Sequence, residues 1–83
     1  MSEILLVDDE PLMLKLLELY LVPYGFNCVS KTSGHEAVVY LQQKKAELII
    51  MDVMMPGKDG WETTREIREF SNIPIIMVTA IRQ

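Results

Sequence analysis

Four short apolar runs divide this 83-residue chain, and longer amphipathic segments separate them. Each run is continuous instead of alternating between apolar and polar residues, which is typical of strands in a parallel sheet buried on both faces. We therefore predict an α/β fold with strands at Ile4 to Val7, Phe26 to Ser30, Leu48 to Met51 and Ile75 to Val78.

Start and stop signals predict three helices between these strands. The first begins near Pro11, since proline suits a first-turn position, and ends at Pro23 and Gly25. The second begins at Ser33 and the third at Asp59, each with a glutamate three residues later as in a capping box. Helical spacing predicts that the apolar face of the first helix consists of Leu12, Met13, Leu16, Leu17, Tyr20 and Leu21.

Helices between parallel strands form right-handed crossovers, and this rule restricts the topology. We expect a flavodoxin-like, doubly wound sheet in the order 2-1-3-4. The first helix then lies on one face, and the second and third helices lie on the other. Ligands of such sheets bind beyond the carboxyl ends of the strands, at the switch point between strands one and three.

Composition narrows the class of protein. The chain is one small domain at most, so its core is marginal unless a metal, a ligand or oligomerisation adds stability. A net charge of −4, with no cluster of lysine or arginine, argues against nucleic-acid binding by this chain alone. No apolar stretch approaches the roughly 18 residues that span a bilayer. With no secretory signal and one cysteine, Cys28, a cytoplasmic location is expected.

Acidic residues follow two of the predicted strands that should be neighbours. Asp8, Asp9 and Glu10 come directly after the first strand, Asp52 comes directly after the third, and Thr79 follows the fourth. Each acid alone could be a helix cap or the start of a turn. Together they predict converging carboxylates, which repel one another unless a cation is bound. Oxygen ligands of this kind suit Mg²⁺.

Three segments resemble the receiver (CheY-like) domain of bacterial two-component response regulators: residues Ile4 to Pro11, Leu48 to Gly60 and Pro74 to Ala80. The resemblance implies a phosphoprotein of phosphorelay signal transduction. Asp52 would accept a phosphoryl group from a sensor histidine kinase, and Thr79 would be the hydroxyl that senses it. By the same resemblance Asp8, Asp9, Asp52 and the backbone carbonyl of Met54 would bind Mg²⁺. Such a domain is no enzyme beyond self-phosphorylation and autodephosphorylation.

The resemblance also sets out what this chain lacks. Receivers commonly have about 120 residues, with a fourth helix, a fifth strand that ends in a lysine, and a fifth helix. We therefore expect a single incomplete receiver over residues 1–83, truncated after strand four and impaired in phosphorylation. Lys31, Lys44 and Lys45 are not expected at the carboxyl end of a strand, and Lys58 lies in the loop after Asp52 without matching the family's lysine.

The truncation predicts self-association. Strand four becomes an uncharged edge, and either Ile75 and Met77 or Ile76 and Val78 lose their cover. We expect a dimer formed through the strand-four edge or by exchange of elements.

Two other functions stay open. A phosphorylation-incompetent chain could act only as an oligomerising or interaction module. An aspartate-nucleophile phosphatase would also use a magnesium-binding acid cluster, but such enzymes generally carry an Asp-x-Asp pair, whereas Asp8 and Asp9 are adjacent here. No phosphate-binding loop of the Gly-x-x-x-x-Gly-Lys-Ser/Thr type occurs in the sequence.

Overall fold

A four-stranded parallel sheet forms the centre of the molecule in a computed structural model that describes residues 2–79. The strand order is β2-β1-β3-β4, as predicted from the crossover rule. The strands are β1 (Glu3–Val7), β2 (Asn27–Lys31), β3 (Leu48–Asp52) and β4 (Ile75–Val78). All four predicted strands are therefore confirmed, with shifts of one residue at several ends.

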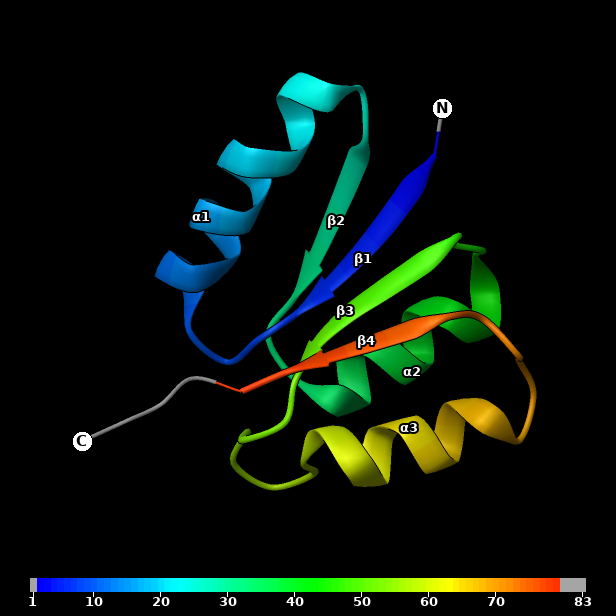
Figure 1. The fold of residues 1–83 in the computed structure, drawn as a ribbon. Coiled ribbons are helices and arrows are strands. Elements are labelled where there is room, and N and C mark those ends of the chain that lie inside the picture. The colour runs from blue at the N-terminus through cyan, green and yellow to red at the C-terminus, as the bar shows by residue number, and fades with distance from the viewer. Residues whose placement is uncertain (1, 80–83) are drawn as a thin grey trace.

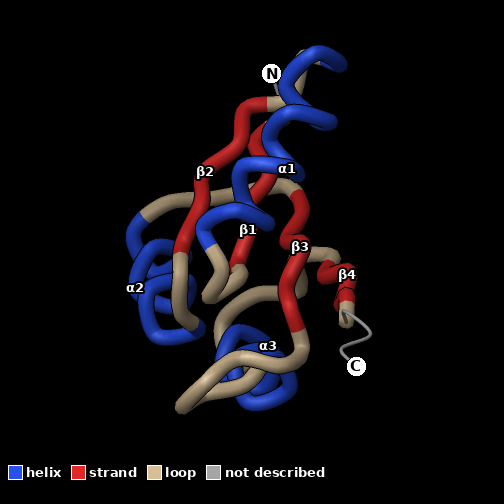
Figure 2. The backbone as a smooth tube through the Cα atoms, turned by 90° about the vertical axis from the view of Figure 1, so that its left-hand side faces the viewer, coloured by secondary structure: helices blue, strands red, loops and turns tan. Residues whose placement is uncertain are grey.

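The helices divide unequally between the two faces of the sheet. They are α1 (Pro11–Leu21), the short 3₁₀ helix η1 (Val22–Tyr24), α2 (Gly34–Gln43) and α3 (Gly60–Arg68). Figure 1 shows α1 on one face and both α2 and α3 on the other. Viewed from the α1 side, α1 lies in front of β1 and β2, while β3 and β4 have no helix in front of them (Figure 2).

Both predicted caps are present. The Ser33 hydroxyl accepts a hydrogen bond from the backbone N–H of Glu36 at 3.1 Å, and the Asp59 carboxylate accepts one from that of Glu62 at 2.9 Å. These bonds satisfy backbone donors that the first turn of a helix leaves without an intrahelical partner. The sequence signals therefore place the starts of α2 and α3 correctly.

The core has two parts, one on each side of the sheet. The larger part packs α2 and α3 against the sheet around Leu5, Ile49 and Ile67, which are fully buried. The smaller part lies under α1, where Leu14 packs with residues of β1 such as Leu6. The α1 face is therefore the thinner side of the molecule.

The structure corrects the predicted face of α1. Leu14 is the one buried residue of this helix, with Leu17 partly buried against the sheet. Leu12, Leu16 and Tyr20 are exposed. The helix contains apolar residues almost all the way round, so periodicity alone could not identify which of them face the sheet.

Three details at strand ends also differ from the sequence predictions. Asp52 is the last residue of β3 instead of following it. β2 spans Asn27–Lys31, one residue later than expected at both ends. Lys31 consequently does lie at the carboxyl end of a strand, where its backbone carbonyl accepts a hydrogen bond from the N–H of Asp8 at 3.1 Å. The prediction that Lys31 does not lie at the carboxyl end of a strand was therefore wrong.

Of the two pairs considered for β4, the exposed pair is Ile76 and Val78. Both are exposed, whereas Ile75 and Met77 pack against the larger core.

Across the described residues 2–79, the helices are too short or too polar for a membrane span.

A side-chain hydrogen bond ties α2 to the start of β1. The Tyr40 hydroxyl donates to the Glu3 carboxylate, and the Lys31 ammonium lies 5.4 Å from the centre of the Tyr40 ring. The hydrogen bond, reinforced by burial, raises the pKa of Tyr40 to about 12. The tie therefore contributes its full stability below pH 10, the ordinary pKa of tyrosine, and loses it as the pH rises toward 12.

We expect Tyr40→Phe to lower the free energy of unfolding by about 1 kcal/mol, because it removes the donor to a half-buried carboxylate and keeps the ring under Lys31. Urea unfolding at neutral pH measures this difference, which should shrink toward pH 12. Tyr24→Phe is the matched control, since the Tyr24 side chain is 81% exposed. Equal losses in the two variants would contradict a stabilising role for the Tyr40 hydroxyl.

Candidate functional site

Parallel pairing of β1 with β3 brings the predicted acids together. Val7 pairs with Met51, so Asp8 and Asp52 follow at adjacent positions of the same sheet edge. Asp52 in turn pairs with Val78, which puts Thr79 at the end of the next strand. The register alone thus gathers residues that lie up to 71 positions apart in the chain.

Three consecutive carboxylates form a tight cluster after β1. Carboxylate oxygens of Asp8, Asp9 and Glu10 all lie within 4.8 Å of one another. Asp8 is only 6% exposed, and its Oδ1 accepts a hydrogen bond from the Glu10 backbone N–H at 2.9 Å. Burial raises the pKa of Asp8, the Glu10 N–H opposes this, and the nearby charge of Asp52 adds to the increase. The negative charge of this cluster is therefore destabilising in itself.

Asp52 lies in a small cavity between α1 and β4. Its side chain is buried, and its Oδ1 accepts a hydrogen bond from the Met54 backbone N–H at 3.3 Å. The cavity has a volume of about 240 Å³ and is lined by Asp8, Met13, Leu17, Asp52, Val78 and Thr79. The structure thus puts three of the predicted site residues, Asp8, Asp52 and Thr79, around one space.

The other two predicted residues line a second, wider pocket. Asp9 and Met54 border a space of about 430 Å³ together with the loop that follows β3, namely Met55, Pro56, Gly57 and Asp59. The Oδ1 atom of Asp9 is buried and has no hydrogen-bond partner among residues 2–79. A buried carboxylate oxygen that accepts no hydrogen bond, together with the neighbouring carboxylates, offers oxygen ligands that fit a hard cation such as Mg²⁺.

Two lysines near this end of the sheet are engaged elsewhere. Lys58 forms an ion pair with Glu66 of α3. Lys31 turns toward Tyr40 of α2, on the face of the sheet opposite α1. Neither lysine lines the cavity that contains Asp52.

Sequence reasoning missed Gly60 as part of the site. A Cβ atom at this position would lie 2.5 Å from the backbone oxygen of Asp52, and the Gly60 N–H donates to the carbonyl of Val53 at 3.0 Å. The start of α3 can therefore pack directly against the end of β3 only because residue 60 has no side chain. The glycine after the Asp59 cap was the available signal.

Two apolar residues of α1 were also missed. Met13 and Leu17 line the cavity of Asp52, although the sequence assigned them only to the core. Their position follows from how α1 crosses the sheet, which helical periodicity does not specify.

Comparison with known proteins places the chain in a family. The model of the response regulator receiver domain matches residues 4–83. The probable transcriptional regulator ycf27 of Porphyra purpurea is 38% identical over 80 residues, which are 96% of this chain and 33% of that protein. The transcriptional regulatory protein BaeR of Escherichia coli is 44% identical over 77 residues, 93% of this chain and 32% of that protein. The chain spans about a third of these curated relatives.

Solved structures agree with the sequence comparison. The response regulator TrrA of Thermotoga maritima, crystallised in complex with Mg²⁺–BeF, is 36% identical with a TM-score of 0.92, over 98% of this chain and 71% of that one. Because the family model matches residues 4–83, and the described residues 2–79 form a parallel sheet in the order β2-β1-β3-β4, this chain belongs to the response regulator receiver domain family.

Proposed function

We propose that this chain is the phospho-acceptor of a cytoplasmic two-component system and receives a phosphoryl group on Asp52 from a sensor histidine kinase. The observation that carries the proposal is the position of Asp52. Its buried carboxylate lies at the carboxyl end of β3, in a cavity shared with Asp8 and Thr79. A carboxylate so placed can act as a nucleophile toward phosphorus and form an acyl phosphate.

The chain's own residues orient the acceptor. The Met54 N–H donates a hydrogen bond to Oδ1 of Asp52, and the Met13 and Leu17 side chains give the cavity an apolar wall. The transferred group forms a bond from phosphorus to a carboxylate oxygen as its bond to the donor breaks, through a loose transition state that depends mainly on positioning and charge neutralisation. Thr79, at the same cavity, is the hydroxyl placed to bond the new phosphoryl group.

We further propose that Mg²⁺ is held by Asp9, Asp8, Asp52 and the carbonyl of Met54. The supporting features are the buried Oδ1 of Asp9 and the raised pKa of Asp8. When bound, the ion supplies positive charge against the carboxylates and the equatorial phosphoryl oxygens. The response regulator TrrA was crystallised in complex with Mg²⁺–BeF, which by similarity supports a magnesium site in this chain.

Phosphorylation can be measured directly. We expect acetyl phosphate with Mg²⁺ to add one covalent phosphate to the wild-type chain, detected by intact-mass spectrometry in acid, and to add none to Asp52→Asn. Glu47→Gln is the control, since it removes an exposed carboxylate at the opposite end of the sheet. Phosphate on Asp52→Asn, or none on the wild type, would contradict the acceptor assignment.

Metal binding has an independent readout in thermal stability. At ten times its dissociation constant, a ligand that binds only the folded state stabilises it by roughly 1.4 kcal/mol. For a domain of this size we expect Mg²⁺ to raise Tm by several degrees.

Asp9→Ala should abolish this shift. Glu47→Ala should retain it, because Glu47 is exposed and precedes β3 at the opposite end of the sheet. A full shift in Asp9→Ala would exclude Asp9 as a ligand.

A second candidate function, that of an oligomerising module, is favoured by the exposed Ile76 and Val78 of β4. Burying such side chains contributes roughly 1.5–3 kcal/mol each. We propose self-association that covers β4, through its edge or by exchange of elements. Light scattering should give a mass of at least twice the 9.5 kDa of one chain at micromolar concentrations. A monomeric mass throughout that range would exclude this function and leave phospho-acceptance untouched.

A further inference from the structure

The loop after β3 reaches from the proposed phospho-acceptor to the start of α3. Met54 lies in this loop, with an N–H that donates to Oδ1 of Asp52 and a carbonyl proposed above as a metal ligand. Asp59 ends the loop as the cap of α3, and it borders the same pocket as Asp9 and Met54. The positions of these groups therefore depend on what holds the start of α3 in place.

The starts of α2 and α3 approach each other very closely. A Cβ atom at Gly34, the first residue of α2, would lie 2.0 Å from Oγ1 of Thr63 in α3 and 3.3 Å from the backbone oxygen of Lys58. A real Cβ atom does not come within 2.0 Å of another atom, so α2 can occupy this position only because residue 34 has no side chain. Figure 1 shows the two helices on the same face of the sheet, where they contact each other.

Thr63 connects this contact to the loop. Its side chain is fully buried, and its hydroxyl donates a hydrogen bond to the carbonyl of Asp59 at 2.8 Å. The N–H of Thr63 donates to the same carbonyl at 3.0 Å. Gly34 thus packs against the side chain that holds the backbone of Asp59, and it also packs against the backbone of Lys58. A displacement of Thr63 would therefore move the end of the loop.

The first turn of α3 has no free space on its other side. A Cβ atom at Gly60 would lie 2.5 Å from the backbone oxygen of Asp52, so this turn already lies against the end of β3. The start of α3 is consequently packed between β3 on one side and Gly34 on the other. Because protein interiors are close-packed, an atom inserted between Gly34 and Thr63 must shift the helix and the loop that leads into it.

We propose that Gly34 and Thr63 are positioning residues of the magnesium site, because their contact fixes the start of α3 and so sets the position of the loop that carries Met54. The inference rests on the metal site proposed above, and it adds the residues that hold the loop of that site. Mg²⁺ requires oxygen ligands in nearly octahedral geometry at about 2.1 Å, so a small displacement of one ligand weakens binding. Neither Gly34 nor Thr63 lines the two pockets at the site, so both act only through the loop.

A methyl group at residue 34 tests the inference. We expect Gly34→Ala to weaken Mg²⁺ binding at least roughly tenfold, measured by isothermal titration calorimetry with MgCl₂. Gly34→Ala/Thr63→Ala should bind Mg²⁺ more tightly than Gly34→Ala, because it removes the Oγ1 atom that the new methyl group would meet. Gly34→Ala/Thr63→Val should stay at least as weak as Gly34→Ala, since valine has nearly the shape of threonine and keeps an atom at the Oγ1 position.

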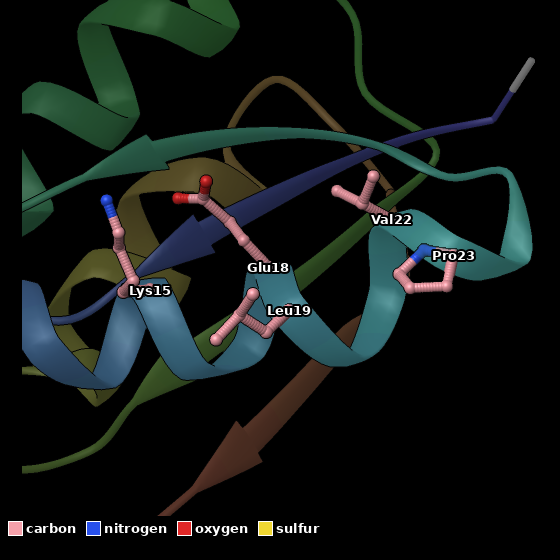
Figure 3. Close-up of a pocket in the computed structure, with 5 residues that line it drawn as sticks. All are labelled: Lys15, Glu18, Leu19, Val22 and Pro23. Carbon is pink, nitrogen blue, oxygen red and sulfur yellow. The ribbon is translucent and has the colours of Figure 1, made fainter.

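Gly25→Ala is the matched control for a general loss of stability. Gly25 has a φ of +91°, and apart from its chain neighbours nothing lies within 4 Å of its Cβ position, so alanine strains the backbone there without displacing a neighbour. Gly25 follows η1, where Figure 3 shows Val22 and Pro23 beside a pocket of about 260 Å³. That pocket shares no residue with the two at the acidic site. We expect Gly25→Ala to lower Tm and to keep the wild-type affinity for Mg²⁺.

Each result supports or overturns the inference. Wild-type affinity in a folded Gly34→Ala, or an equal loss of affinity in Gly25→Ala, overturns the positioning role and leaves the metal site intact. A wild-type chain that binds no Mg²⁺ overturns the metal site and this inference together. If circular dichroism shows that Gly34→Ala does not fold, Thr63→Val decides. It removes only the hydroxyl that holds Asp59, so it should weaken Mg²⁺ binding severalfold, and an unchanged affinity overturns the inference.

Discussion

Repulsion among carboxylates at one end of the sheet is the constraint on which the rest of this structure depends. The pairing of β1 with β3 forces Asp8 beside Asp52, and chain continuity adds Asp9 and Glu10. Burial then makes the charges more costly, as the raised pKa of Asp8 reflects. A cluster of carboxylates with perturbed pKa values is typical of a functional site, and the proposed cation binding and phosphoryl transfer would both use its negative charge.

The sequence was sufficient to predict the sheet order and the acidic site because both depend on strong local signals. Continuous apolar runs indicated the strands, and the caps at Ser33 and Asp59 indicated two helix starts. Handedness of the crossovers then determined which strand ends meet. Asp8, Asp52 and Thr79 line one cavity for that reason, although their roles in binding and transfer are proposals.

What the sequence did not predict depends on packing between elements. Lys31 was not expected at the end of a strand because the predicted bounds of β2 lay one residue too early. The buried side of α1 was misassigned because leucines occur on several sides of that helix, and only contact with the sheet selects Leu14. Gly60 was missed because its importance comes from close contact with the backbone of Asp52, which arises only when the loop after β3 folds back on the end of the strand.

Phospho-acceptance and self-association use overlapping surfaces in this molecule. Val78 lines the cavity that contains Asp52, and it is also one of the exposed β4 residues that the proposed self-association would cover. Asp8 and Asp52, both proposed as ligands of the metal, line that same cavity, whereas Asp9 and the loop after β3 border a separate pocket. Covering β4 would therefore bear on metal binding and on access to Asp52 together. The face of the sheet that carries α1 alone therefore contains both the cavity of the proposed acceptor and the exposed apolar residues of β4.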